Sequence, residues 1–83
     1  MPKSLYTERH KAIAAMIAKT RRDNGFTQVH VAESMGGGWS QPIIASIERG
    51  GRRLDLVELI KLADIIQLDL HELIDHLRTI PDE

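Results

Sequence analysis

Two glutamines stand at the start of two short stretches with helical spacing of apolar residues, Gln28 before one and Gln41 before the other. A side-chain amide donates and accepts hydrogen bonds at once, so it can pair with adenine through two bonds, whereas a hydroxyl can pair with any base. The free N–H groups at a helix start also suit phosphate oxygens. Alone, each glutamine is better explained as a solvated residue. It is the arrangement of the two that favours a surface that contacts nucleic acid.

The second stretch, residues 41–49, separates into two faces when its residues are placed at about 100° per step. Ile44 and Ile47 fall on one side with Ile43 at its edge, and we expect this side to anchor the stretch to a core. The other side is small and polar, which suits close approach to a groove in which apolar groups touch thymine methyls. We therefore expect base contacts from Gln41, Pro42, Ala45 and Ser46.

Five helices are predicted to position these residues, and no β alternation of any length appears. We expect Thr7 to be the N-cap of the first helix, and each of the last two helices begins with an Asp that is followed three residues later by a Glu. We expect an all-α fold in one domain, residues 1–83, with a helix-turn-helix at about 27–49. The expected helices run from about 7 to 23, from 27, from 40 or 41, from about 55 to 66, and from 69 to 78.

Composition narrows the class of protein. The chain of 83 residues suffices for one small domain, and the lack of cysteine excludes disulfides and thiolate zinc sites. No signal-peptide pattern and no apolar run of membrane-spanning length occurs, so we expect a cytoplasmic protein without a membrane partner.

The charge is split along the chain. Residues 1–53 hold nine Lys or Arg and four Asp or Glu, a charge of +5. Residues 54–83 hold two Lys or Arg and eight Asp or Glu, a charge of −6. The net charge of −1 does not reveal this difference. Such a split favours a polyanionic partner for the N-terminal part, and an ordinary mixed surface is the alternative.

Residues about 10–75 resemble the lambda-repressor-like, Cro-type (XRE) helix-turn-helix regulators, in particular their small stand-alone members. The resemblance is carried by Arg21-Arg22-x-x-Gly25-Phe26-Thr27-Gln28, Val31-Ala32-x-x-Met35-Gly36, Ser40-Gln41-x-x-Ile44-x-x-Ile47-Glu48-Arg49-Gly50 and Leu56-x-x-Leu59-x-x-Leu62-Ala63.

The resemblance implies a compact five-helix fold and roles for its residues. Gln28 would hold a phosphate and buttress Gln41, while Arg21 and Glu48 match positions that form a structural ion pair. Arg52 and Arg53 directly follow a glycine turn after residues 41–49, the helix expected to contact bases (the reading helix), and this position favours phosphate contact. We expect contacts to the DNA backbone from Thr27, Gln28, Ser40, Ile43, Arg49, Arg52, Arg53 and Arg22.

The turn between the two glutamines departs from the family pattern. The family usually places the second Gln 11 residues after the first, and here the separation is 13 residues, from Gln28 to Gln41. The extra length falls in Gly36-Gly37-Gly38-Trp39. Trp39, the only Trp, is interpreted as a plug between the second and third helices, with contact to DNA backbone or sugar as the alternative.

The predicted helix at about 55–66 has more apolar residues than one core-facing stripe needs. Surplus apolar surface suggests self-association. We expect a two-fold homodimer through residues about 54–80, with two reading helices about 34 Å apart. A fully packed monomer with two exposed aliphatics is the alternative. The expected interface residues are Val57, Ile65 and Leu68.

An enzyme or a metal site is not expected. In His71-Glu72-Leu73-Ile74-Asp75-His76 the second His is at i+5, whereas a zinc-protease helix needs i+4. The sequence has no phosphate-binding loop and no nucleophile and base at a spacing typical of a catalytic site. We also expect no cofactor.

The sequence thus predicts a sequence-specific, DNA-binding transcriptional regulator, in the form of a repressor that binds a palindromic operator in double-stranded DNA as a dimer. The alternative is the antitoxin of a toxin–antitoxin pair, which would bind both DNA and a protein toxin. A third hypothesis, an interaction domain that has lost DNA binding, predicts no shift with any duplex.

Overall fold

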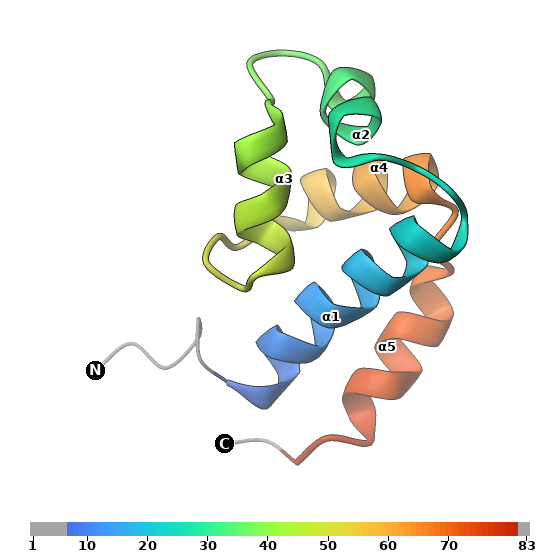
Figure 1. Ribbon diagram of the computed structural model, residues 1–83. Helices are drawn as coiled ribbons and strands as arrows, with labels where there is room; N and C mark the ends of the chain where they lie inside the picture. Colours follow the sequence, from blue (N-terminus) through green and yellow to red (C-terminus); the bar gives the residue numbers. More distant parts are fainter. Residues whose placement is uncertain (1–6, 82–83) are drawn as a thin grey trace.

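The computed structural model describes residues 7–81, and these form five helices and no strand (Figure 1). The prediction of an all-α fold is confirmed, and the helix limits lie within about one residue of the expected ones. The helices are α1 (Glu8–Asp23), α2 (Gln28–Met35), α3 (Gln41–Glu48), α4 (Leu56–Ile66) and α5 (Leu70–Arg78).

Side-chain caps set four of the helix starts. The hydroxyls of Thr7 and Thr27 accept hydrogen bonds from the backbone N–H three residues on, at 3.1 and 3.0 Å. Asp55 and Glu58 form a full capping box, in which each side chain accepts from the other's backbone N–H, at 2.8 and 3.0 Å. The Asp69 carboxylate accepts from the first turn of α5. Each cap satisfies N–H groups that have no partner within the helix, so the chain is directed into a helix at these positions.

One core receives side chains from every helix. α1 contacts α3, α4 and α5, while α2 packs against α3 and α4, so α2 and α3 rest on a platform made by the longer helices (Figure 1). Burial of each large aliphatic side chain contributes about 1.5–3 kcal/mol. The most deeply buried are Ile17, Val31, Ile44, Leu62, Ile66 and Leu73.

Two long-range hydrogen bonds tie helix ends to this platform. Lys61 Nζ donates to the carbonyl of Met35 at the last turn of α2, at 2.9 Å. Asn24 Nδ2, just after α1, donates to the carbonyl of Ile66 at the end of α4, at 2.8 Å. Because carbonyls at a helix end lack intrahelical partners, these bonds satisfy them. The first holds α2 against α4, and the second ties the end of α1 to the end of α4.

Candidate nucleic-acid interface

α3 buries its isoleucines and opens its other side to solvent. Ile44 and Ile47 are 1% and 2% exposed. Ser40 precedes the helix, and its side chain makes no capping hydrogen bond, so the helix does not use this hydroxyl. The residues of α3 and its C-cap that are exposed on the outer side are Gln41, Pro42 and Arg49. The first turn therefore presents an amide and a proline ring, next to an unused hydroxyl.

The middle of the same side is less open. Ala45 and Ser46 are half-buried. The turn after α3 folds back on Ser46, because the Gly51 N–H donates to the Ser46 carbonyl at 2.9 Å, and a Cβ on Gly51 would lie 3.1 Å from Ser46 Oγ. Ile43 is half-buried and packs against the core. The start of α3 is thus more accessible to a ligand than its middle.

A chain of hydrogen bonds supports Gln41 from below. Gln41 Nε2 donates to Gln28 Oε1 at 2.6 Å, and Gln28 Nε2 donates to Glu48 Oε1 at 2.9 Å. Since both polar atoms of the Gln28 amide are engaged, its orientation is set from both sides. The structure therefore brings together the two glutamines that stand 13 residues apart in the sequence and aligns the outer one.

The base of this chain is the ion pair of Arg21 and Glu48, which joins α1 to α3. Arg21 Nε and Nη2 donate to the two carboxylate oxygens of Glu48 at 2.6 and 3.1 Å, and Nη1 donates to the carbonyl of Phe26 at 2.8 Å. The side chains are only 12% and 7% exposed. Two parallel bonds between a guanidinium and a carboxylate fix direction as well as distance. Glu48 thus has a structural role and also orients Gln28.

A groove runs between the end of α1 and the starts of α2 and α3, with basic and hydroxyl groups along it. Arg22 and Thr27 are both exposed there, although the Thr27 hydroxyl already caps α2. Val29, in the first turn of α2, is 52% exposed and is not among the contact residues expected from the sequence. The signal that could have found it is its place directly after Gln28. The groove is lined by Arg21, Arg22, Gly25, Phe26, Thr27, Gln28, Val29 and Gln41.

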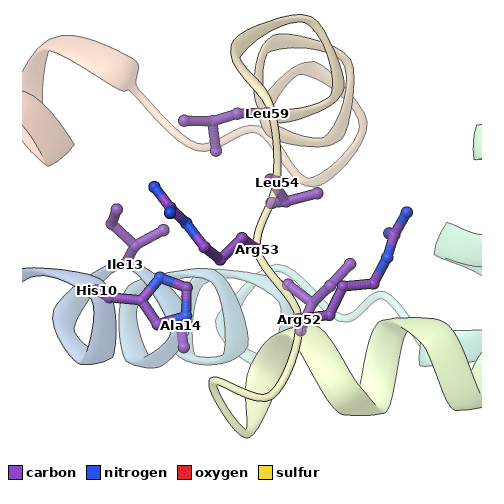
Figure 2. A pocket seen from close by; sticks show the side chains of 8 residues that line it. His10, Ile13, Ala14, Arg52, Arg53, Leu54 and Leu59 are labelled. Carbon is purple, nitrogen blue, oxygen red and sulfur yellow. The ribbon is translucent and has the colours of Figure 1, made fainter. Parts of the chain in front are cut away.

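The two arginines after α3 do not act alike. Figure 2 shows Arg52 and Arg53 extending in opposite directions from the segment that leads to α4. Arg53 is exposed, as a phosphate contact requires. Arg52 instead turns toward the protein, with its guanidinium 4.6 Å from the centre of the Trp39 ring and Nη2 at 3.5 Å from Glu58 Oε2. Trp39 is half-buried against the core.

The residues expected at a dimer interface lie in different surroundings. Val57 is 78% exposed, but Ile65 is half-buried against the core and Leu68 is only 9% exposed within it. Leu68 is turned inward because the preceding residue has a left-handed backbone, so Leu68 has little surface left for a second subunit. Two exposed aliphatics that are not among the expected interface residues, Leu56 (70%) and Ile60 (43%), share a side of α4 with Val57.

Within 7–81, no group of three or more His, Asp or Glu side chains is arranged to hold a metal ion. Over that range, too, no helix combines the length and the apolar character that crossing a membrane demands.

A comparison with protein families gives a match over most of this fold. A family model described as helix-turn-helix matches residues 17–73, which include all of α2, α3 and α4. Neither the curated proteins nor the solved structures gave a match. The family match spans more than half of the chain and agrees with the motifs that carry the resemblance. The chain therefore belongs to the helix-turn-helix family, as a Cro-like (XRE-type) DNA-binding regulator of transcription.

Proposed function

We propose that the protein is a sequence-specific repressor that inserts α3 into the major groove of a palindromic operator and binds it as a homodimer. The observation that carries the proposal is the chain of hydrogen bonds from Glu48 through Gln28 to Gln41. It uses one N–H of the Gln41 amide. The second N–H and the amide oxygen stay available, and these are the two groups that pair with N7 and N6 of adenine.

The same chain orders Gln41 before DNA arrives. A surface glutamine normally loses rotamer freedom when it binds, and a partner at 2.6 Å removes part of that cost in advance. One good bidentate contact discriminates against a wrong base by about 1–3 kcal/mol. Pro42 and Ala45 on the same side of α3 would contact thymine methyls, and Ser46 would add a weaker polar contact.

Cationic side chains on either side of α3 would hold the phosphates. Arg22 lies beside the groove at the start of α2, and Arg49 and Arg53 follow the end of α3, all three exposed. Ser40 supplies a hydroxyl that α3 does not use. With about six phosphates neutralised per dimer, the logarithm of affinity falls with the logarithm of salt concentration at a slope of about −5.

The dimer would form through α4. Leu56, Val57 and Ile60 are exposed and share one side of that helix. A two-fold contact through this side would pair two identical surfaces and leave both copies of α3 free, with the spacing of about 34 Å that one turn of the duplex demands. The protein would act in the cytoplasm, where the DNA is.

Selection of binding sites from random duplex DNA tests the proposal. A repressor of this kind enriches a palindrome with two half-sites about one helical turn apart, and a salt titration on the enriched site then gives the slope. If no palindrome is enriched, the repressor hypothesis fails.

The antitoxin alternative rests on the same aliphatic surface. Leu56, Val57 and Ile60 lie in the part of the chain with a charge of −6, which suits a small basic protein as partner. Co-purification with such a protein, at the expense of the homodimer, would favour this hypothesis over self-association.

A further inference from the structure

The turn between α2 and α3 has little packing of its own. Gly36, Gly37 and Gly38 all have positive φ angles (73°, 45° and 85°), and a Cβ added at any of them would meet no atom within 4 Å. One backbone bond closes the turn, from the Trp39 N–H to the Gly36 carbonyl at 3.0 Å. Three glycines in open space leave a flexible connection, so the position of α3 depends on what holds Trp39.

Trp39 is held between the core and Arg52. Its ring packs on the core cluster from one side, and the guanidinium of Arg52 lies 4.6 Å from the ring centre. A guanidinium at this distance is attracted by the negative face of the indole. Arg52 Nη1 is buried and has no hydrogen-bond partner among the described residues, so the contacts that direct the guanidinium are the one to the ring and the one from Nη2 to Glu58.

Arg52 is in turn held by the start of α4. Its Nη2 lies 3.5 Å from Glu58 Oε2, while Glu58 Oε1 accepts the Asp55 N–H of the capping box at 3.0 Å. The Glu58 side chain is 28% exposed and serves both contacts. The first turn of α4 is therefore linked through Glu58 and Arg52 to Trp39, the residue that precedes the N-cap of α3.

We propose that Arg52 is a positioning residue that fixes the start of α3 through Trp39, and that it does not hold a phosphate. This inference rests on the proposed function, in which the first turn of α3 contacts bases. The cation–π contact replaces the stiffness that the three glycines remove from the turn, and it keeps Gln41 within reach of Gln28. Arg53, which extends from the other side of the same segment toward α1, would hold a phosphate (Figure 2).

The test compares R52Q with R53Q in the full chain, on the selected duplex and on an unrelated duplex, over a series of salt concentrations. For R52Q we expect affinity for the selected duplex to fall about three- to fivefold per subunit, the range of an exposed cation–π interaction, with the salt slope and the affinity for the unrelated duplex unchanged. For R53Q we expect weaker binding of both duplexes and a slope smaller by about 1 for each phosphate that the variant no longer neutralises. If R52Q behaves as we expect of R53Q, Arg52 holds a phosphate and the inference is wrong.

Conservative variants and the single Trp separate positioning from general stability. R52K keeps the positive charge but loses the planar guanidinium that reaches both the Trp39 ring and Glu58, so we expect it to restore only part of the affinity. Full rescue by Lys would contradict the inference. We expect the fluorescence emission of Trp39 to change in R52Q and to change less in E58Q. In R53Q it should remain as in the wild type. Unchanged Trp39 emission in R52Q would overturn the inference, whether or not the wild type selects a duplex. Failure of the wild type to select any duplex would refute only the proposed function.

Discussion

The α2–α3 pair and the α4–α5 pair bury aliphatic side chains in the same core, yet they expose opposite chemistry. The first pair presents an aligned amide and hydroxyls, and exposed arginines (Arg22, Arg49 and Arg53) lie in the segments next to it. The second presents aliphatic side chains on α4 and α5, in a part of the chain with a charge of −6. A surface that binds a polyanion benefits from ordered polar groups and positive charge, whereas a surface that binds a protein benefits from apolar area. The difference indicates that the two pairs meet different partners, which substitutions on each side can test.

The largest effect is expected at the ion pair beneath the reading surface. Glu48→Ala leaves the Arg21 guanidinium, 12% exposed, without its carboxylate, and leaves Gln28 without its acceptor. Removal of one partner of a buried pair costs about 3–5 kcal/mol. We expect the free energy of unfolding in urea to fall by that amount, with Glu33→Ala, an exposed change on α2, as the control. A decrease below about 1 kcal/mol would show that the pair contributes no more than a surface salt bridge.

The next effect is on recognition alone. Gln41→Ala removes the exposed amide but no core contact, so the free energy of unfolding should change by less than about 0.5 kcal/mol. Affinity for the selected duplex should fall by about 1–3 kcal/mol, and affinity for an unrelated duplex should not change. Competition binding with both duplexes measures this, with Ser34→Ala on the exposed side of α2 as the control. An equal decrease on both duplexes would mean that Gln41 contacts backbone and not bases.

Val57→Asp tests the aliphatic surface of α4. Val57 is 78% exposed in the single chain, so the change should leave the fold intact. If Val57 is buried between two subunits, its removal weakens the dimer by about 1.5 kcal/mol or more, which is about tenfold in the dissociation constant. Sedimentation over a concentration series measures the shift. A wild type that stays monomeric at high micromolar concentration would defeat the dimer proposal.

Leu68 serves as the contrast for Val57. It is 9% exposed and part of the core, so Leu68→Ala should lower the free energy of unfolding by about 2–5 kcal/mol. If Leu68→Ala weakens the dimer by no more than its loss of folding stability explains, Leu68 belongs to the core and Val57 to the interface. A change in dimerisation without a change in stability would reverse that assignment.

The parts of the structure that depend on local chemistry could be predicted from the sequence. The caps at Thr7, Thr27 and Asp55 depend on a few neighbouring residues, and the isoleucines of α3 depend on helical spacing. The match to known motifs pointed to Arg21 and Glu48, which the structure places in direct contact. These features need no knowledge of how distant elements pack.

What could not be predicted depends on tertiary neighbours. Helical spacing gives the direction of Leu56 on α4 but not whether another helix covers it. Helical spacing also does not apply beyond Gln67, whose left-handed backbone precedes Leu68. The inward turn of Arg52 depends on Trp39 and Glu58, which come from two other segments. Charge and position alone made Arg52 and Arg53 look equivalent.

The smallest expected effect concerns how the two pairs end their first helices. The C-cap of α2 is Gly36, with φ 73° and ψ −166°, a conformation that in practice only glycine adopts, whereas the C-cap of α4 is Gln67, with φ 65° and ψ 39°. A left-handed non-glycine residue is strained by about 1–2 kcal/mol, and glycine there relieves the strain at the cost of a more disordered unfolded chain. We expect Gln67→Gly to raise the free energy of unfolding by about 0.5 kcal/mol and to leave DNA affinity unchanged. A lower urea midpoint would mean that the Gln67 side chain makes an interaction that outweighs the strain, so that the end of α4 is specified by its side chain and not by backbone freedom.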